Sequence, residues 1–172
     1  MQLSYQPAFD PYHAIYRFLR LRQSLLPKGT LHRDHFRILD FYLLFPFRID
    51  AIKLKQAHRK FRRLARDFAS SKPYGELPDD RLLLGRMDPL QSAAFETMAA
   101  KQLIDPKELE VGNITATDRA IPTELSERVE TDNAAQKGLI DFLDVLATEY
   151  QLLGSDGLKD RTNLLEHRYD AL

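Results

Sequence analysis

Two closely spaced histidines, His32 and His35, are the first residues in the chain whose types and spacing could perform chemistry. On a helix, this spacing would place both rings on one face, where Asp34 or Asp40 could complete a zinc site. The sequence has no HExxH motif and no second histidine pair with a carboxylate. Because isolated histidines near a helix start are usually capping or surface residues, the sequence predicts no metal site.

The chain also lacks the motifs of nucleotide hydrolysis and of nucleophilic catalysis. Neither GxGxxG nor GxxxxGK[ST] occurs, there is no GxSxG, and there is no cysteine. Glu124, Glu127 and Glu130 recur every three residues, which is typical of a solvated helical face rather than of an acid–base pair. We therefore predict a protein that is not an enzyme and that uses no cofactor.

Binding is better supported than catalysis, because basic residues gather between positions 50 and 70. Only Asp50 and Asp67 oppose the basic side chains of this segment. They are Lys53, Lys55, Arg59, Lys60, Arg62, Arg63 and Arg66. Such a surface could neutralise a nucleic-acid backbone or dock on an acidic protein. It could equally be a solvated face that pairs with the chain's own acidic half.

The charges divide the chain into two halves. Basic and acidic residues number 25 each, but residues 1–86 hold 17 basic and 8 acidic ones, which leaves 8 and 17 for the remainder. This asymmetry indicates two surfaces with different partners. A length of 172 residues, with 44% hydrophobic ones, suits a single domain over 1–172. Because no apolar run is long enough to span a bilayer and no signal-peptide pattern opens the chain, we expect a cytoplasmic protein without membrane contact.

Hydrophobic periodicity predicts a mainly α-helical fold with several packed helices. The expected helices are 11–26, 35–47, 50–70, 90–103, 124–129, 132–153 and 158–169. Asp–Pro pairs at 10–11 and 88–89 predict helix starts, because aspartate caps the first turn and proline needs no hydrogen bond there. The pair at 105–106 is expected to end a helix. Pro46 is expected to break the second helix after Phe45.

The segment 35–47 is the most apolar in the chain and should be buried on most of its circumference. Phe41, Tyr42, Phe45 and Phe47 are its bulky members. Such side chains usually form the core, but a chain this small need not cover all of them, so a partner helix could also contact them.

A short β-hairpin is predicted around Gly112 and Asn113, a turn-forming pair that residues typical of strands flank on both sides. A winged helix has its elements in this order: helix, turn, helix and small hairpin. We therefore expect a winged-helix-like part over 88–122, followed by the acidic C-terminal helices.

Three stretches resemble a known family: YQPAFDPYHAIYRFLRL at 5–21, RILDFYLLFPFRI at 37–49 and GLKDRTNLLEHRYDAL at 157–172. They are similar to the small middle components of bacterial ABC three-component (ABC-3C) conflict systems of the Lamassu type. The resemblance implies an adaptor without an active site. It would join an SMC-like or Rad50-like ABC ATPase to an effector, often a nuclease, in defence against phages or plasmids, and could contact DNA through that complex.

The residues alone leave a second function open. A small DNA-binding regulator could use the winged-helix region or the basic helix to bind duplex DNA. An unrecognised hydrolase is a third alternative, and it would need a pocket of converging polar side chains.

Overall fold

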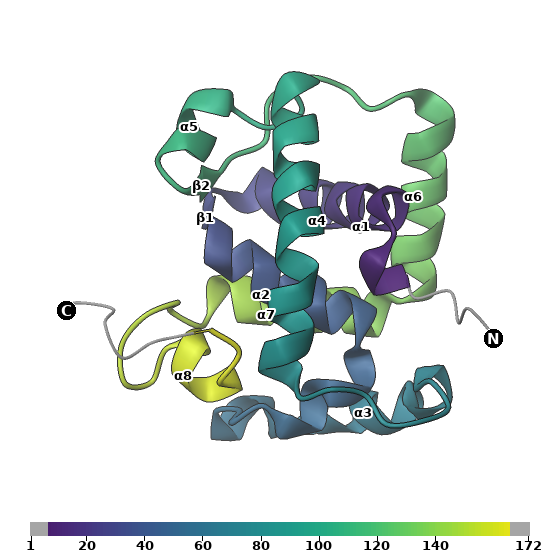
Figure 1. Cartoon of the computed structure of the whole chain (residues 1–172), viewed down its shortest axis with the longest axis vertical. Coiled ribbons are helices and arrows are strands. Elements are labelled where there is room, and N and C mark those ends of the chain that lie inside the picture. The colour runs from purple at the N-terminus through teal and green to yellow at the C-terminus, as the bar shows by residue number, and fades with distance from the viewer. Residues whose placement is uncertain (1–6, 166–172) are drawn as a thin grey trace.

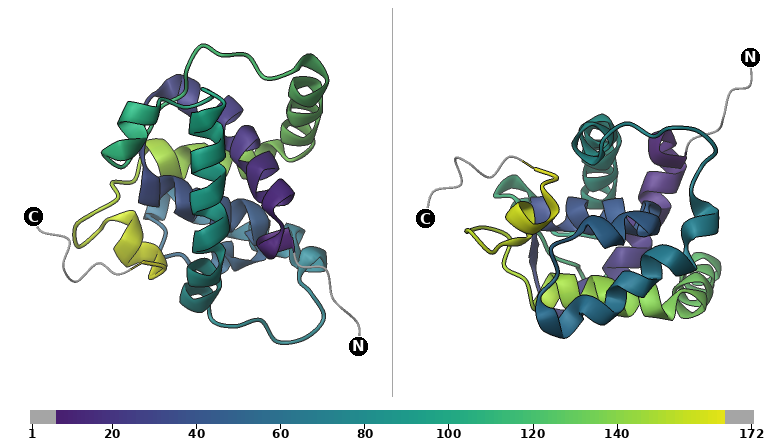
Figure 2. Two further views of the ribbon diagram at one scale, coloured as in Figure 1. Left: turned by 45° about the horizontal axis from the view of Figure 1, so that its top comes forward. Right: turned by 90° about the horizontal axis from the view of Figure 1, so that it is seen from below.

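Helices stacked in three layers form the body of the protein, which the computed structural model describes for residues 7–165 (Figure 1). The middle layer holds α1 (Pro11–Leu25) and α2 (Arg33–Leu44). α4 (Asp80–Ala100) crosses one side of this layer, and α7 (Lys137–Thr148) packs on the other side, as the end-on view in Figure 2 shows. α6 (Thr123–Ala135) packs on α1. The prediction of a mainly helical protein is confirmed.

The middle layer carries much of the core. All residues from His35 to Leu43 are buried, so the predicted burial of this segment is confirmed. Phe41, Tyr42, Phe45 and Phe47 are each at most 8% exposed and lie in the core of this chain. α2 ends at Leu44 and a 3₁₀ helix, η3 (Pro46–Ala51), follows, because Pro46 cannot continue the α-helix.

The predicted start of α1 is also confirmed. Oδ1 of Asp10 accepts hydrogen bonds from the backbone N–H groups of Tyr12 at 2.8 Å and His13 at 3.1 Å. Pro11 occupies the first helical position, where a missing N–H costs nothing.

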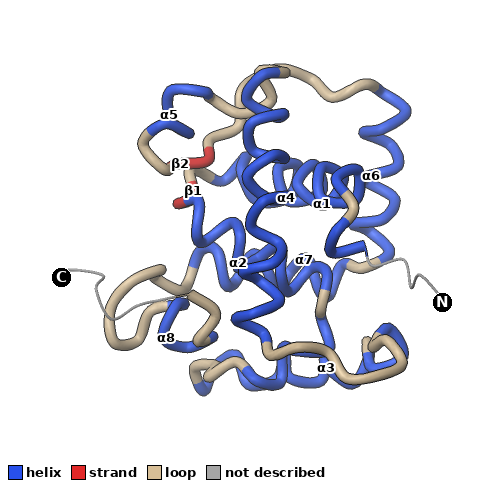
Figure 3. The backbone as a smooth tube through the Cα atoms, in the orientation of Figure 1, coloured by secondary structure: helices blue, strands red, loops and turns tan. Residues whose placement is uncertain are grey.

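The predicted hairpin does not form. Asn113–Ile114 is strand β2, but its antiparallel partner is β1 (Leu31–His32), far away in the sequence (Figure 3). Gly112 does make the turn, with φ of +85°, and its carbonyl accepts the N–H of Arg33 at 2.8 Å. The fold thus has a small two-stranded antiparallel sheet, and the winged-helix assignment is not confirmed.

The Asp–Pro pairs differ in what they do. Asp105 begins a new helix, α5 (Pro106–Glu110), which the sequence prediction had missed. The pair at 88–89 does not begin a helix, because α4 already starts at Asp80, with Asp79 as its cap. Burial of Leu83, Leu84 and Met87 holds the turns that precede Pro89 against the core, so tertiary packing overrides the local signal.

The segment predicted as one helix over 50–70 consists of short pieces. After η3, the chain is extended at Ile52 and then forms η4 (Gln56–Arg62), α3 (Arg63–Asp67) and η5 (Ala69–Ser71). The N–H of Lys53 donates to the carbonyl of Arg161 at 3.0 Å, and that of Lys55 donates to the hydroxyl of Tyr150 at 3.0 Å. These long-range hydrogen bonds replace the local ones that a continuous helix would need.

The C-terminal part contains two pieces followed by a short helix, as predicted, but with different bounds. α6 and α7 break at Gln136, and α7 ends at Thr148. α8 (Leu158–Thr162) is capped at its C-terminus by Asn163, which has a left-handed φ of 54°. The helix predicted to reach 169 is therefore shorter, and its positions from 166 lie outside the described residues. No helix within 7–165 has both the length and the apolar character to cross a bilayer.

Candidate interaction surface

The seven basic residues predicted as a binding site are all exposed. We call them the basic surface: Lys53, Lys55, Arg59, Lys60, Arg62, Arg63 and Arg66. None of them forms an ion pair with a carboxylate in the described part of the chain. Within residues 7–165, the acidic half of the chain therefore forms no ion pair with this surface.

Two lysines of the basic surface do have other contacts. Nζ of Lys55 donates to the carbonyl of Glu149 at 2.5 Å and lies 4.6 Å from the centre of the Tyr150 ring. Nζ of Lys60 lies 5.3 Å from the centre of the Phe61 ring. The four arginines of the basic surface have no such contact within the described residues, so their guanidinium groups are open to a partner.

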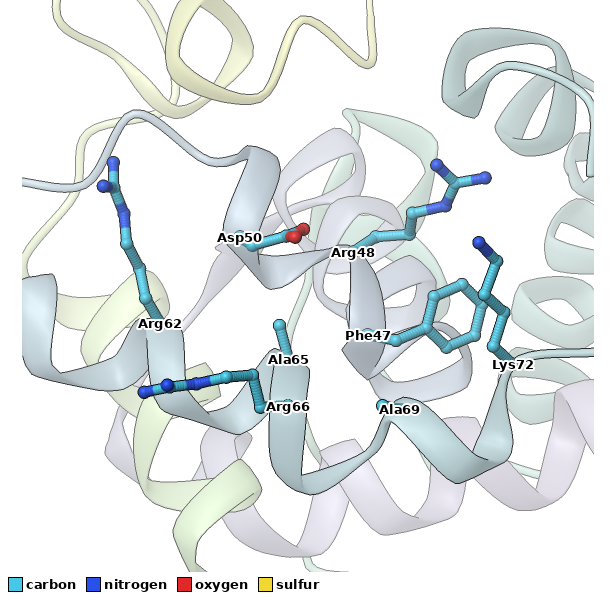
Figure 4. Close-up of a pocket in the computed structure, with 8 residues that line it drawn as sticks. All are labelled: Phe47, Arg48, Asp50, Arg62, Ala65, Arg66, Ala69 and Lys72. Carbon is cyan, nitrogen blue, oxygen red and sulfur yellow. The ribbon is translucent and has the colours of Figure 1, made fainter.

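A pocket of about 510 Å³ lies beside the basic surface, between η3 and the segment that contains α3. Figure 4 shows its lining: Phe47, Arg48, Asp50, Arg62, Ala65, Arg66, Ala69 and Lys72. The structure thus brings Arg62 and Arg66 together with two further cations, Arg48 and Lys72. Sequence reasoning missed Arg48 because it follows the most apolar segment, and missed Lys72 because it begins a loop.

Arg48 is held in place without hydrogen bonds that would saturate it. Its guanidinium carbon lies 5.7 Å from the centre of the Phe47 ring, and Nε lies 3.3 Å from Oδ1 of Asp80. Neither Nε of Arg48 nor Oδ1 of Asp80 has a hydrogen-bond partner among the described residues. Burial raises the pKa of the Asp80 carboxyl, although the charge of Arg48 opposes this shift.

The arginines of α1 contrast with those of the basic surface, because Arg17, Arg20 and Arg22 are buried. Arg17 forms a two-pronged ion pair with Asp40, with Nε to Oδ1 at 2.6 Å and Nη2 to Oδ2 at 3.1 Å. Nε2 of Gln91 donates to the same carboxylate at 2.9 Å. This network fixes α1, α2 and α4 against one another.

Arg22 is bound by the backbone rather than by a carboxylate. Its guanidinium donates to the carbonyl oxygens of Leu103 at 2.7 Å, Thr117 at 2.9 Å and Arg119 at 2.8 Å. Arg20 donates from Nε to Oδ1 of Asn133 at 2.8 Å. Burial lowers the pKa of both Arg20 and Arg22, so their hydrogen bonds compensate for lost hydration.

A second ion network joins α8 to the middle layer. Nζ of Lys159, which is 7% exposed, lies 3.1 Å from Oδ2 of Asp34. Nη1 of Arg37 lies 3.3 Å from Oδ1 of the same carboxylate. Burial alone would raise the pKa of Asp34, but Lys159 and Arg37 hold it below its ordinary value. Arg17, Arg37 and Lys159 come from the three stretches that carry the family resemblance.

The two histidines considered as metal ligands have other partners. Nδ1 of His32 accepts the N–H of Asp34 at 3.1 Å and caps α2. His35 is buried, and its Nε2 bonds the carbonyl oxygen of Leu146 at 2.8 Å. Within residues 7–165, no three histidine or carboxylate side chains are grouped to hold a metal ion.

One polar cluster was missed because its members are far apart in the sequence. Nδ1 of His58 lies 2.9 Å from the Tyr150 hydroxyl, and Nε2 lies 3.1 Å from Oε2 of Glu149. His58 and Tyr150 are 8% and 3% exposed. The cluster attaches η4, which carries part of the basic surface, to the chain after α7.

The structure thus combines a mainly helical body, which holds several charges in buried networks, with an exposed basic surface that forms no ion pair within the described residues. The model of one family, ABC-three component (ABC-3C) system Middle Component 5, matches residues 3–170. The protein therefore belongs to this family, and the predicted resemblance to the middle components of ABC-3C systems is confirmed. No curated protein and no solved structure matches the chain.

Proposed function

We propose that this middle component is a non-enzymatic adaptor that links the ABC ATPase of its system to the effector. Membership of the ABC-3C family supports a role beside other components. The basic surface carries the proposal further. Residues 48–72 hold nine basic and two acidic side chains, whereas an ordinary solvated surface mixes both signs.

A second charged region supports contact with two partners. Exposed Glu124 and Glu127 lie on α6, which Figure 1 places at the upper right, whereas α3 lies at the bottom of the same view. Buried hydrogen bonds of Arg17 and Arg20 link α1 to α2 and α6 in the body that carries both regions. In the proposed complex, which acts in the cytoplasm, one region meets an SMC-like ATPase and the other meets a nuclease effector, as in Lamassu-type defence.

Co-expression of this chain with the ATPase and effector of its own system tests the proposal. We expect a tagged copy of the chain to retain both proteins through size-exclusion chromatography. Omitting the chain should separate the ATPase from the effector and abolish protection against phages or plasmids. A complex of ATPase and effector that assembles and protects cells without this chain would contradict the adaptor function.

The unpaired arginines also favour a second candidate function, a DNA-binding regulator. Neutralised phosphates make such binding largely independent of sequence and steeply dependent on salt. This candidate requires the isolated chain to bind duplex DNA at low salt, with loss of binding when Arg59, Arg62, Arg63 and Arg66 are changed to glutamate. The adaptor proposal instead expects tight DNA contact only within the complex.

A further inference from the structure

We propose that the pocket between η3 and α3 binds an acidic peptide segment of a partner protein, in which a carboxylate side chain neighbours an apolar one. This inference deepens the adaptor function and rests on it, because it names the chemistry that the partner must present. The pocket, of about 510 Å³, suits a few side chains rather than a whole folded surface.

Four cations surround the pocket from two sides. Figure 4 shows Arg62 and Arg66 on one side and Arg48 and Lys72 on the other. Arginine binds carboxylates through two parallel N–H···O hydrogen bonds, which gives both strength and a defined orientation. A peptide in which acidic residues flank an apolar residue on both sides therefore matches the placement of these cations.

Among the four cations, Arg48 has contacts that restrict its guanidinium before a ligand binds. The Phe47 ring and the Asp80 carboxylate restrict its guanidinium, which lowers the entropy that binding would otherwise cost. Its side chain remains 28% exposed. Nε is buried beside Asp80, but the guanidinium makes no hydrogen bond to other described residues, so its two Nη groups are available to a carboxylate.

The lining favours a peptide over a nucleic acid. Phe47, Ala65 and Ala69 give the pocket an apolar floor, which a phosphodiester backbone cannot use. Phe47 is a buried residue, only 8% exposed, so its ring offers no open face on which a base could stack. Asp50 also lies within the pocket, where its carboxylate can accept a peptide N–H, which a nucleic-acid backbone does not have.

Fluorescence anisotropy with the full-length chain tests this inference, with three labelled probes. The first is the peptide EEFEE, the second is its uncharged counterpart QQFQQ, and the third is a DNA duplex of about 20 base pairs. We expect EEFEE to bind at least about tenfold more tightly than QQFQQ, because charge-assisted hydrogen bonds would be lost. EEFEE should also bind more tightly than the duplex.

A matched pair of variants locates the binding. Arg62→Gln with Arg66→Gln removes two charges from the pocket and should weaken EEFEE binding about tenfold. Lys101→Gln with Lys107→Gln removes two charges from exposed positions outside the pocket and should change the affinity by less than about twofold. Circular dichroism of both proteins checks that the fold is intact.

Three results would overturn the inference. These are equal binding of EEFEE and QQFQQ, equal effects of the two double variants, or tighter binding of the duplex with the same dependence on Arg62 and Arg66. The adaptor function is judged separately by co-purification. If the three components co-purify but EEFEE does not bind, the adaptor function is supported and the pocket inference is contradicted. If the components do not co-purify, the adaptor function is contradicted, whether or not EEFEE binds.

Discussion

Two groups of arginines show how one residue type serves two purposes in this protein. Arg17, Arg20 and Arg22 on α1 are buried and bind carboxylate, amide and carbonyl oxygens from distant parts of the chain. The arginines of η4 and α3 are exposed and have no partner within the described residues.

The difference in burial between the two groups of arginines shows which charges the fold needs. A buried guanidinium loses its hydration, so each one must be matched by oxygen atoms at defined positions and becomes part of the architecture. An exposed guanidinium requires no such match, so the fold does not explain why four of them stand together.

The largest effect should come from the ion pair between Arg17 and Asp40. Asp40→Ala leaves a buried charge without its carboxylate, and Gln91 loses the nearer of its two acceptors. We expect the free energy of unfolding to fall by about 3–5 kcal/mol in urea denaturation. Asp144→Ala, which breaks the exposed pair with Lys28, should cost less than about 1 kcal/mol.

Similar losses for Asp40→Ala and Asp144→Ala would show that burial does not distinguish the two classes of ion pair. Adding Arg17→Met to Asp40→Ala should restore part of the lost stability, because the uncompensated charge is then removed.

Arg22→Met should have the next largest effect. It removes three hydrogen bonds to the backbone carbonyls of Leu103, Thr117 and Arg119, which tie the chain after α4 to α1. We expect a loss of about 2–3 kcal/mol in the same denaturation experiment. Arg86→Met, at an exposed position of α4, serves as the control and should change stability by less than about 0.5 kcal/mol.

The sequence predicted the parts of this contrast that depend on local pattern. Apolar spacing identified α1 and α2, Asp10 with Pro11 identified a helix start, and Pro46 identified a helix end. The burial of Arg17 and Arg22 could not be predicted, because their partners lie on other elements and only the tertiary structure brings those oxygens together. For such residues, charge is a poor guide to exposure.

The same limit explains the errors around the candidate site. The basic segment was predicted as one helix, since its apolar residues have helical spacing, but Lys53 and Lys55 bond to distant residues and helical structure resumes only at Gln56. β2 was predicted to pair within a hairpin, but it pairs with β1, which lies far away in the sequence. All seven predicted basic residues proved exposed, whereas Arg48 entered the site only through the pocket that η3 and α3 form.

A smaller effect should appear with pH. Burial lowers the pKa of His35, with a further contribution from the charge of His32, so His35 is neutral in the folded protein. The unfolded chain binds its proton below about pH 6.5, so the free energy of unfolding should fall as the pH drops below that value. His35→Gln should reduce this slope between about pH 7 and pH 5 in thermal denaturation.

The contribution of Asp34 lies in a different range. Because its folded pKa is depressed, its stabilisation should be lost only as the pH falls below the ordinary value of about 3.9.

For His35→Gln, an unchanged slope of the free energy of unfolding against pH above about pH 5 would contradict the role assigned to His35.

The smallest effect on stability should come from the exposed arginines. Changing Arg59, Arg62, Arg63 and Arg66 together to glutamine should alter the free energy of unfolding by less than about 1 kcal/mol, since no described contact is lost. A loss comparable to that of Arg22→Met would mean that these side chains belong to the architecture after all.

The central claim is that the basic surface is covered by a partner while the buried networks keep the body unchanged. Hydrogen–deuterium exchange of the chain, alone and in complex with the ATPase and effector of its system, tests this claim most directly. We expect slower exchange over residues 48–72 in the complex and unchanged exchange in the buried part of α1. A complex that forms with no change in exchange over residues 48–72 would contradict it.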